Sequence, residues 1–120
     1  GARHAGLLVE SSVHVNADVP AAVGLCAYRI IQESLSNAGR HAPGAAVTVT
    51  VRHDLHGLEV DVTNGPVTGS APRAAIEAGR GHGLAGMRER VVLLGGSLSA
   101  RPTDGGGFAV RAVLPVGSPS

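Results

Sequence analysis

Two runs of alternating apolar and polar residues, joined by a very short turn, constrain the fold of this chain more than any other feature. Residues Ala46–Asp54 read AVTVTVRHD and residues Leu58–Thr63 read LEVDVT, with a turn at His56–Gly57. Because side chains alternate between the two faces of a strand, such runs predict an antiparallel hairpin with one buried face. Local hairpins exclude a doubly wound sheet of parallel strands.

A long amphipathic helix is predicted before this hairpin. Asp18 suits the N-cap, Pro20 fits the first turn, and Pro43–Gly44 should end the helix near His41. We expect Tyr28 to pack under the first strand. The apolar and small residues that recur at helical spacing should form the buried face: Ala27, Ile30, Ile31, Ser34 and Ala38.

The remaining segments complete an α+β pattern. They predict a strand at Leu7–Val15, a helix at Leu84–Leu94 before Gly95–Gly96, and a hairpin of Ser97–Arg101 with Phe108–Leu114. Residues 65–82 are expected to be irregular, with a short helix near Arg73–Ala78. This order predicts a two-layer sandwich, with a mostly antiparallel sheet and helices on one face. We expect one domain over residues 1–120, with an ordered core at residues 6–115 and a tail at 116–120.

Composition argues against several classes of function. The chain has a net charge of +1, one Tyr, one Phe and no Trp, so it lacks the charge and the stacking surface that bind nucleic acid. Cys26 is the single cysteine, which excludes an intrachain disulfide and predicts a small buried hydrophobe. No apolar run is long enough to span a bilayer. We therefore expect no nucleic-acid partner, no membrane contact by this domain and a cytoplasmic location, even where the chain belongs to a longer, membrane-anchored protein.

A polar stripe lies along the predicted long helix. Glu33, Asn37 and His41 are spaced at i, i+4 and i+8, and Arg40 lies beside them. Such a stripe can bind a metal–phosphate group or place a base near a γ-phosphate. Taken alone, it is also typical of a solvated helix face, and Arg40 and His41 also suit the negative end of a helix dipole.

Two further features could line a nucleotide pocket. Glycines at 79, 81, 83 and 86 precede and open the second helix, where bare amides can bind an anion. They follow no strand of a βαβ unit and include no Gly-Lys-Ser/Thr, so neither a dinucleotide fingerprint nor a P-loop is present. Asn64 ends a predicted strand, and its amide oxygen could accept from the amino group of adenine, although Asn-Gly also favours turns.

In this order, the features resemble the ATP-binding catalytic domain of two-component sensor histidine kinases. The resemblance rests on YRIIQESLSNAGRHA, the strand that ends at Asn64, GHGLAGMRERV and DGGGFAVRAVLP, and it extends from Leu7 to Pro115. The most similar subgroup includes the nitrate-sensor and desaturase-regulating kinases, whose response regulators carry LuxR-type DNA-binding domains. The resemblance implies the sandwich of gyrase and histidine-kinase ATPases.

The resemblance also implies roles for individual residues. Glu33 would polarise or deprotonate the incoming nucleophile, and Asn37 would bind the Mg²⁺ that bridges the phosphates of ATP. Arg40 and His41 would face the phosphate tail, and Gly105–Gly107 would form a structural turn. The glycine block would close over the phosphates, with these residues near the nucleotide: Gly81, His82, Gly83, Leu84, Gly86 and Met87.

The adenine end departs from the family's pattern. Where the family reads Asp-x-Gly-x-Gly, this chain continues from Asn64 as Gly65-Pro66-Val67-Thr68, and a shifted alignment would place Thr63 at the Asp position instead. Asn keeps the acceptor oxygen but loses the charge, which predicts a weaker nucleotide site because charge-assisted hydrogen bonds are about twice as strong as neutral ones. Residues 65–82 would form a short ATP lid.

The implied activity is transfer of the γ-phosphate of Mg·ATP to a His on the separate dimerisation domain of a parent kinase, which then signals through a response regulator. Five other histidines lie in contexts that do not suit a phosphoacceptor: His4, His14, His53, His56 and His82. The chain would therefore be the catalytic half alone. We expect it to be monomeric in isolation. Two alternatives remain. One is a non-catalytic regulatory module with weak or no ATP binding, and the other is a serine kinase acting on an anti-anti-sigma factor, against which GHGLAGMRERV argues.

Overall fold

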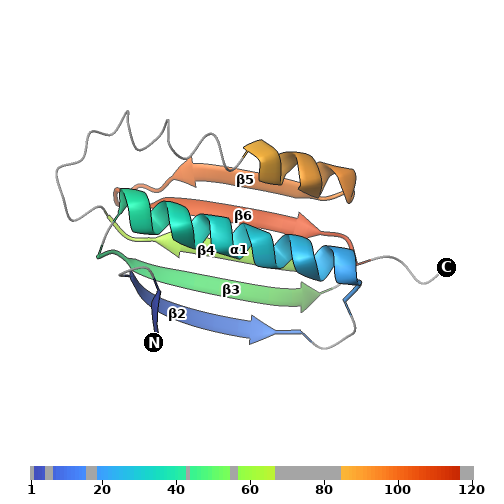
Figure 1. Cartoon of the computed structure of the whole chain (residues 1–120), viewed down its shortest axis with the longest axis horizontal. Helices are drawn as coiled ribbons and strands as arrows, with labels where there is room; N and C mark the ends of the chain where they lie inside the picture. The colour runs from blue at the N-terminus through green and yellow to red at the C-terminus, as the bar shows by residue number, and fades with distance from the viewer. Residues whose placement is uncertain are drawn as a thin grey trace.

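A mostly antiparallel sheet forms one layer of the structure, and helices form the other (Figure 1). The computed structural model describes residues 2–4, 7–15, 19–42, 44–54, 57–66 and 85–116. Within these ranges the strand order is β1-β2-β3-β4-β6-β5, and only β2 with β3 is parallel. The strands are β1 (Ala2–His4), β2 (Leu7–His14), β3 (Ala46–Asp54), β4 (Gly57–Asn64), β5 (Ser97–Pro102) and β6 (Phe108–Leu114). The predicted fold class is confirmed.

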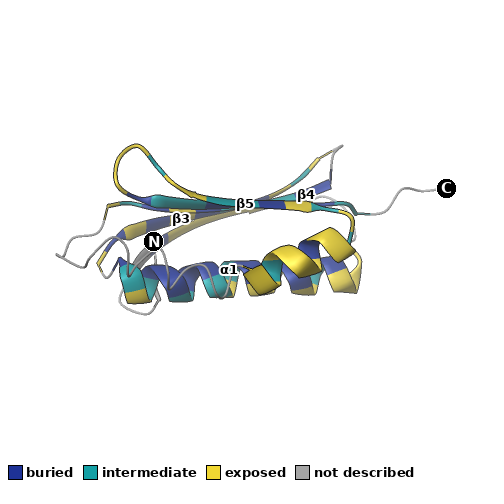
Figure 2. Ribbon diagram, turned by 90° about the horizontal axis from the view of Figure 1, so that it is seen from above, coloured by how far each residue is buried: buried dark blue, intermediate teal, exposed yellow. Residues whose placement is uncertain are grey.

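The two predicted hairpins are present, and their register follows from the alternating patterns. Val49 pairs with Val62 and Val51 with Val60, so the apolar residues of β3 and β4 share one face. β6 adds to the other edge of β4 with Val62 opposite Val110. The helices lie on one side of the sheet (Figure 2), and the apolar residues of β3, β4 and β6 pack in one buried cluster with those of the helices.

Helix α1 (Ala21–His41) runs along that face. Pro20 is its N-cap residue, with φ −53° and ψ 143°, and the carbonyl of Pro20 accepts the first helical bond from the Gly24 N–H at 3.0 Å. The prediction that Pro20 lies in the first turn is therefore wrong by one position, because its extended ψ places it before the helix. Asp18 lies outside the described residues. At the other end, the Ala42 N–H donates to the Ala38 carbonyl at 2.8 Å.

The buried face of α1 is close to the predicted one. Ala27, Ile30, Ser34 and Ala38 are buried and Ile31 is partly buried. Tyr28, in contrast, points away from the sheet and is exposed, and its hydroxyl accepts a hydrogen bond from Gln32 Nε2 at 2.8 Å. The prediction that Tyr28 packs under the first strand is wrong, because the helix turns that position to solvent.

Residues 85–93 form a second helical segment on the same face of the sheet (Figure 2). It ends in a Schellman arrangement, in which the Gly96 N–H donates to the Val91 carbonyl at 2.8 Å and the Gly95 N–H to the Val92 carbonyl at 2.9 Å. Gly95 has φ +85°, a conformation that glycine adopts without a Cβ penalty. The predicted helix stop at Gly95–Gly96 is confirmed.

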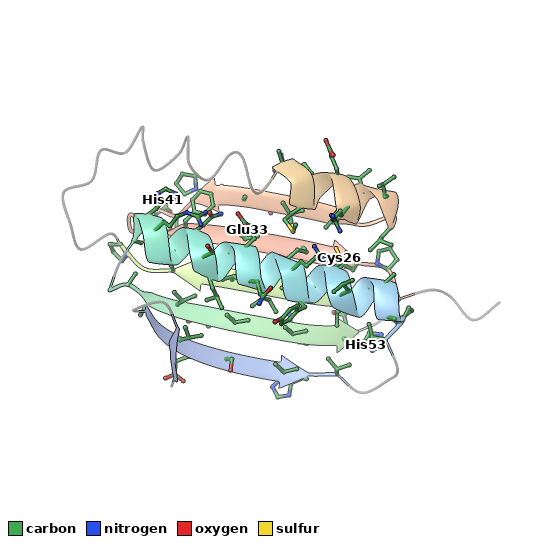
Figure 3. All side chains as sticks on the ribbon, viewed as in Figure 1. Cys26, Glu33, His41 and His53 are labelled. Carbon is green, nitrogen blue, oxygen red and sulfur yellow. The ribbon has the colours of Figure 1, made fainter. Side chains whose placement is uncertain are left out.

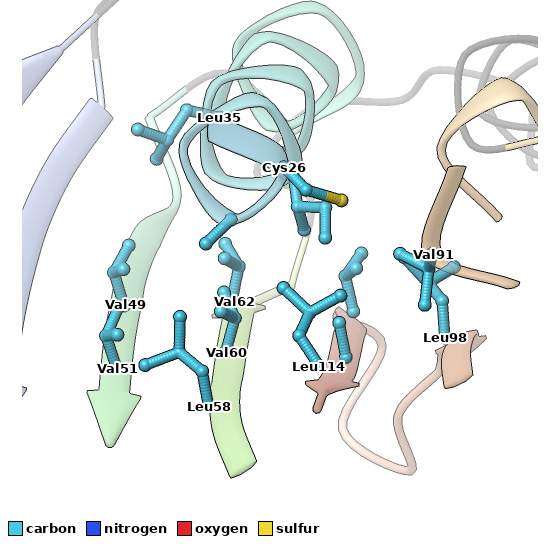
Figure 4. Packing of buried hydrophobic residues seen from close by; sticks show 14 of the residues in the cluster. Cys26, Leu35, Val49, Val51, Leu58, Val60, Val62, Val91, Leu98 and Leu114 are labelled. Carbon is cyan, nitrogen blue, oxygen red and sulfur yellow. The ribbon is translucent and has the colours of Figure 1, made fainter. Parts of the chain in front are cut away.

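The core lies between the two layers (Figure 4). Ile30, Val60, Val91 and Leu114 are fully buried within it. Cys26 packs in the same cluster as a small hydrophobe, and burial raises the pKa of its thiol although Arg90 partly opposes this. No helix among the described residues is both long and apolar enough to cross a membrane.

The other face of the sheet carries a network of charges. Glu59 Oε1 lies 3.2 Å from Arg52 Nη2 and 3.1 Å from Arg111 Nη2, and Arg111 Nε lies 3.8 Å from Asp61 Oδ1. Burial opposes ionisation of Glu59, but a hydrogen bond with Asp61 and the two guanidinium groups outweigh it and lower the pKa of Glu59. The pKa of Asp61 is raised by burial and by the hydrogen bond with Glu59.

We expect Glu59→Gln to lower the free energy of unfolding at pH 7, because it removes the ion pairs with Arg52 and Arg111. The loss should be at most about 1 kcal/mol, since solvent screens these pairs. A lowered folded-state pKa stabilises the fold above the ordinary glutamate pKa, and that stabilisation is lost as pH falls through the lower, folded-state value. Urea unfolding of both proteins between pH 7 and pH 3 measures the difference. A deficit of Glu59→Gln that grows toward low pH would contradict the assignment.

Ile30→Ala should lower the free energy of unfolding by about 2–5 kcal/mol, because it opens a cavity beneath α1 where Ile30 is fully buried. Leu25→Ala on the same helix is the matched control. Leu25 is 52% exposed, so its loss should cost much less. Thermal unfolding followed by circular dichroism compares the two variants. Equal losses would show that α1 does not pack as described.

Candidate functional site

The polar stripe of α1 passes from solvent into the interior. Glu33 is 30% exposed, Asn37 is 4% exposed and His41 is partly buried. Figure 3 shows Glu33 and His41 along the edge of α1 that faces β6 and β5. The sheet-facing residues Ser34 and Ala38 adjoin this edge and fix its direction. The stripe is therefore not a solvated helix face, since its central residue is covered by the fold.

The guanidinium of Arg40 contacts three other polar side chains of α1. Its Nη1 donates to Ser36 Oγ at 2.6 Å, and its Nη2 donates to Asn37 Oδ1. The same Nη2 lies 3.8 Å from Glu33 Oε1. One guanidinium therefore contacts the residue predicted to be the base and the residue predicted to bind a metal. The sequence predicts Arg40 beside the stripe and toward phosphate, but not these bonds.

A groove opens beside Glu33, between α1 and the second helical segment. Its volume is about 400 Å³. Its lining residues from α1 are mostly polar, and Met87 supplies the opposite wall: Arg29, Gln32, Glu33, Ser36 and Met87. Arg29, Gln32 and Ser36 were not predicted as site residues. Arg29 and Ser36 lie four and three positions from Glu33, and Gln32 lies three and four positions from the same two residues, a signal that the sequence did contain.

The oxygen atoms of this edge suit a hard cation. Within the described ranges no cluster of three or more His, Cys, Asp or Glu is placed to hold a metal ion. Mg²⁺, however, commonly takes only one or two protein oxygens together with phosphates and water. Asn37 Oδ1 already accepts from a cationic group, and Asn37 Nδ2 is buried with no hydrogen-bond partner among the described residues. The donor set therefore fits Mg²⁺ that arrives with a nucleotide and its waters.

Asn64 lies on the helix-facing side of the sheet. It continues the inward period of Leu58, Val60 and Val62 and is 7% exposed, whereas Thr63 is exposed. Asn64 Nδ2 donates to the Gly65 carbonyl at 2.8 Å. β4 ends at the same end of the molecule as α1 (Figure 1). Of the two residues considered for an adenine contact, only Asn64 thus faces the layer that holds the stripe.

The glycine block is described only in part. Gly81, His82, Gly83 and Leu84 lie outside the described residues, as do the predicted lid from residue 67 onward and the short helix near Arg73–Ala78. Gly86 is exposed at the start of the helical segment, and a Cβ there would meet no other atom within 4 Å. Met87 lines the groove opposite Glu33. Of the described residues of the block, Met87 therefore lies across the groove from Glu33, while the phosphate-binding role of the block stays a prediction.

Comparison with known proteins identifies the family. Residues 23–118 match the family model of histidine kinase-, DNA gyrase B- and HSP90-like ATPases. The chain is 33% identical over 115 residues to the sensor histidine kinase YxjM of Bacillus subtilis (strain 168), an alignment that covers 88% of this chain and 27% of that protein. The chain belongs to this ATPase family, and it spans about a quarter of the length of that relative.

Solved structures agree with this at the level of the fold. The histidine kinase domain of the blue-light activated kinase of Erythrobacter litoralis EL346 superposes with a TM-score of 0.69 at 23% identity, covering 92% of this chain and 55% of that one. Full-length ShkA in complex with AMPPNP gives a TM-score of 0.68 at 20% identity, covering 97% of this chain and 27% of that one. The α/β sandwich predicted from the sequence is therefore the one found in histidine kinases.

We expect Gly107→Ala to disturb the end of β4. A Cβ at Gly107 would lie 2.0 Å from the Asn64 carbonyl oxygen, so the β5–β6 turn and the strand end must separate. The loss of stability should be about 1–3 kcal/mol, as for other overpacked sites. Gly105→Ala is the matched control, because a Cβ there meets nothing within 4 Å. Urea unfolding compares the two, and equal stabilities would contradict the close approach of the turn to Asn64.

Proposed function

We propose that this chain is the ATP-binding catalytic part of a sensor histidine kinase. In this proposal it binds Mg·ATP and transfers the γ-phosphate to a histidine on a separate dimerisation domain, from which a response regulator takes the phosphoryl group. The membership of the ATPase family and the 33% identity to a sensor histidine kinase support this class of activity. We further propose, on the sequence motifs alone, the subgroup whose regulators carry LuxR-type DNA-binding domains.

One observation carries the proposal: two polar residues four positions apart on α1 have opposite environments. Glu33 opens into the groove of about 400 Å³, whereas Asn37 is buried behind it. A base must meet a nucleophile that arrives from another domain, so it has to be accessible. A metal-binding amide works best where its position is fixed by packing. A solvated helix face would give both residues the same exposure.

The proposed step is an in-line transfer. A ring nitrogen of the acceptor histidine attacks the γ-phosphorus through its lone pair, and the bond from that phosphorus to the bridging oxygen breaks as ADP leaves. The Glu33 carboxylate takes the proton from the other ring nitrogen. Mg²⁺, when bound, neutralises charge on the phosphates. Asn37 Oδ1 would hold that ion, Arg40 and His41 would face the phosphate tail, and the amides of the glycine block would bind phosphate oxygens.

Asn64 would read the adenine. Its Nδ2 is engaged with the Gly65 carbonyl, which leaves Oδ1 as the acceptor for the amino group of the base. A neutral amide should bind that group more weakly than a carboxylate would, because the hydrogen bond is not charge-assisted. We therefore propose a functional but weak nucleotide site. We also propose that one domain extends over the whole chain.

Asn37→Ala should weaken Mg²⁺-dependent ADP binding by about 10- to 100-fold or more, the range found when metal-site partners are removed. The fold should survive, because the change removes an amide whose Nδ2 has no partner among the described residues. Titration calorimetry with ADP and Mg²⁺ measures binding, and thermal unfolding checks the fold. Gln32→Ala, in the same groove but bonded to Tyr28, is the control and should bind normally.

Two outcomes would decide against the proposal. Unchanged Mg²⁺-dependent binding by Asn37→Ala would remove Asn37 from the site. No binding by the unmodified protein at millimolar ADP would instead favour the alternative of a non-catalytic regulatory module with the same fold.

A further inference from the structure

The guanidinium of Arg40 contacts the residues to which the proposed function assigns the metal and the base. Nη2 donates to Asn37 Oδ1 and lies 3.8 Å from Glu33 Oε1, while Nη1 is held by Ser36 Oγ at 2.6 Å. The arrangement has a specific geometry, because the planar fork of arginine directs two N–H groups in fixed directions toward two neighbouring acceptors. Ser36, Asn37 and Arg40 lie within one turn of α1, which fixes their relative positions.

These contacts conflict with metal binding by Asn37. The guanidinium stays positively charged at every accessible pH, and a divalent ion on Asn37 Oδ1 would lie within a few ångströms of it. Two cations at that separation repel each other strongly in a partly buried site. Oδ1 therefore serves either Arg40 or the metal. Arg40 is free to move away, since its side chain is 53% exposed.

We propose that Arg40 is a built-in cation that competes with Mg²⁺ for Asn37, so that metal and nucleotide bind by exchange with the guanidinium. This inference rests on the proposed function. When Arg40 leaves Asn37 Oδ1, the same movement takes its Nη2 away from Glu33 Oε1. The carboxylate proposed as base is thus released only as the metal position fills. Ser36, which holds Nη1, sets how much Mg²⁺ the exchange requires.

The experiment measures ADP binding by the whole chain over a series of Mg²⁺ concentrations, which gives the half-saturating Mg²⁺ concentration. Mn²⁺ binding in the presence of ADP, followed by electron paramagnetic resonance, gives the metal affinity directly. Ser36→Ala removes one hydrogen bond to Arg40 and no charge. We expect about threefold less Mg²⁺ to suffice, with ADP affinity unchanged at saturating Mg²⁺.

Arg40→Gln removes the competing cation, so the half-saturating Mg²⁺ concentration for ADP binding should fall about tenfold. This is the size of effect expected from the loss of one charge-assisted hydrogen bond. ADP affinity at saturating Mg²⁺ should fall, because the phosphates lose a positive partner. Arg40→Lys keeps the charge without the fork and should resemble Ser36→Ala. Arg29→Gln is the matched control: it removes an equal charge from a residue that lines the same groove, and the half-saturating Mg²⁺ should not change.

The competition is overturned if Ser36→Ala and Arg40→Gln need as much Mg²⁺ as the unmodified protein. It is also overturned if Arg29→Gln lowers the requirement as much as Arg40→Gln, because general charge would then explain the effect. Failure of the proposed function would look different: the unmodified protein would show no Mg²⁺-dependent ADP binding, and both ideas would fall. Normal binding that is lost in Asn37→Ala, with no response to Ser36→Ala or Arg40→Gln, would overturn only the role of Arg40.

Discussion

The packing of α1 onto the apolar face of the sheet determines where everything in the candidate site lies. Burial of Ile30, Ser34 and Ala38 against the sheet fixes the rotation of the helix about its axis. Because residues three and four apart share a helix face, that rotation places Glu33 and Asn37 along one edge. The small side chains of Ser34 and Ala38 let the helix lie close to the sheet. Asn37 is buried at this edge for the same reason.

Most of this framework could be predicted from the sequence, because it depends on local periodicity. The alternating valines of β3 and the helical spacing of Ile30, Ser34 and Ala38 each report a buried face directly. Asn64 could be placed too, since it continues the two-residue period of β4. Strand β1 was not predicted: at three residues, it is too short to show alternation and depends on its pairing with β2.

The parts that could not be predicted depend on side-chain conformations and on contacts between elements. The spacing of Ser36 and Arg40 allowed a bond between them, but the same spacing allowed Arg40 to face solvent or phosphate. The groove beside Glu33 exists because Met87 comes from a segment about fifty positions away along the chain. Tyr28 was misplaced because the rotation of α1 that Ile30 fixes turns that position outward, away from the first strand.

The buried amides of Asn64 and Asn37 form their hydrogen bonds through different atoms. Asn64 uses Nδ2 on the Gly65 carbonyl, so its oxygen is available for a base. Asn37 Oδ1 accepts a hydrogen bond from Arg40, so the atom proposed to bind a metal is already engaged. The hydrogen bond that Asn64 Nδ2 donates to a main-chain carbonyl is held by the strand end, whereas the bond that an exposed arginine donates can break with a change of rotamer. Under the proposed roles, the adenine contact is arranged in advance, whereas the phosphate end must rearrange. Nucleotide would then dock by its base first, and the departure of Arg40 would complete the site only when phosphates and metal are both in place.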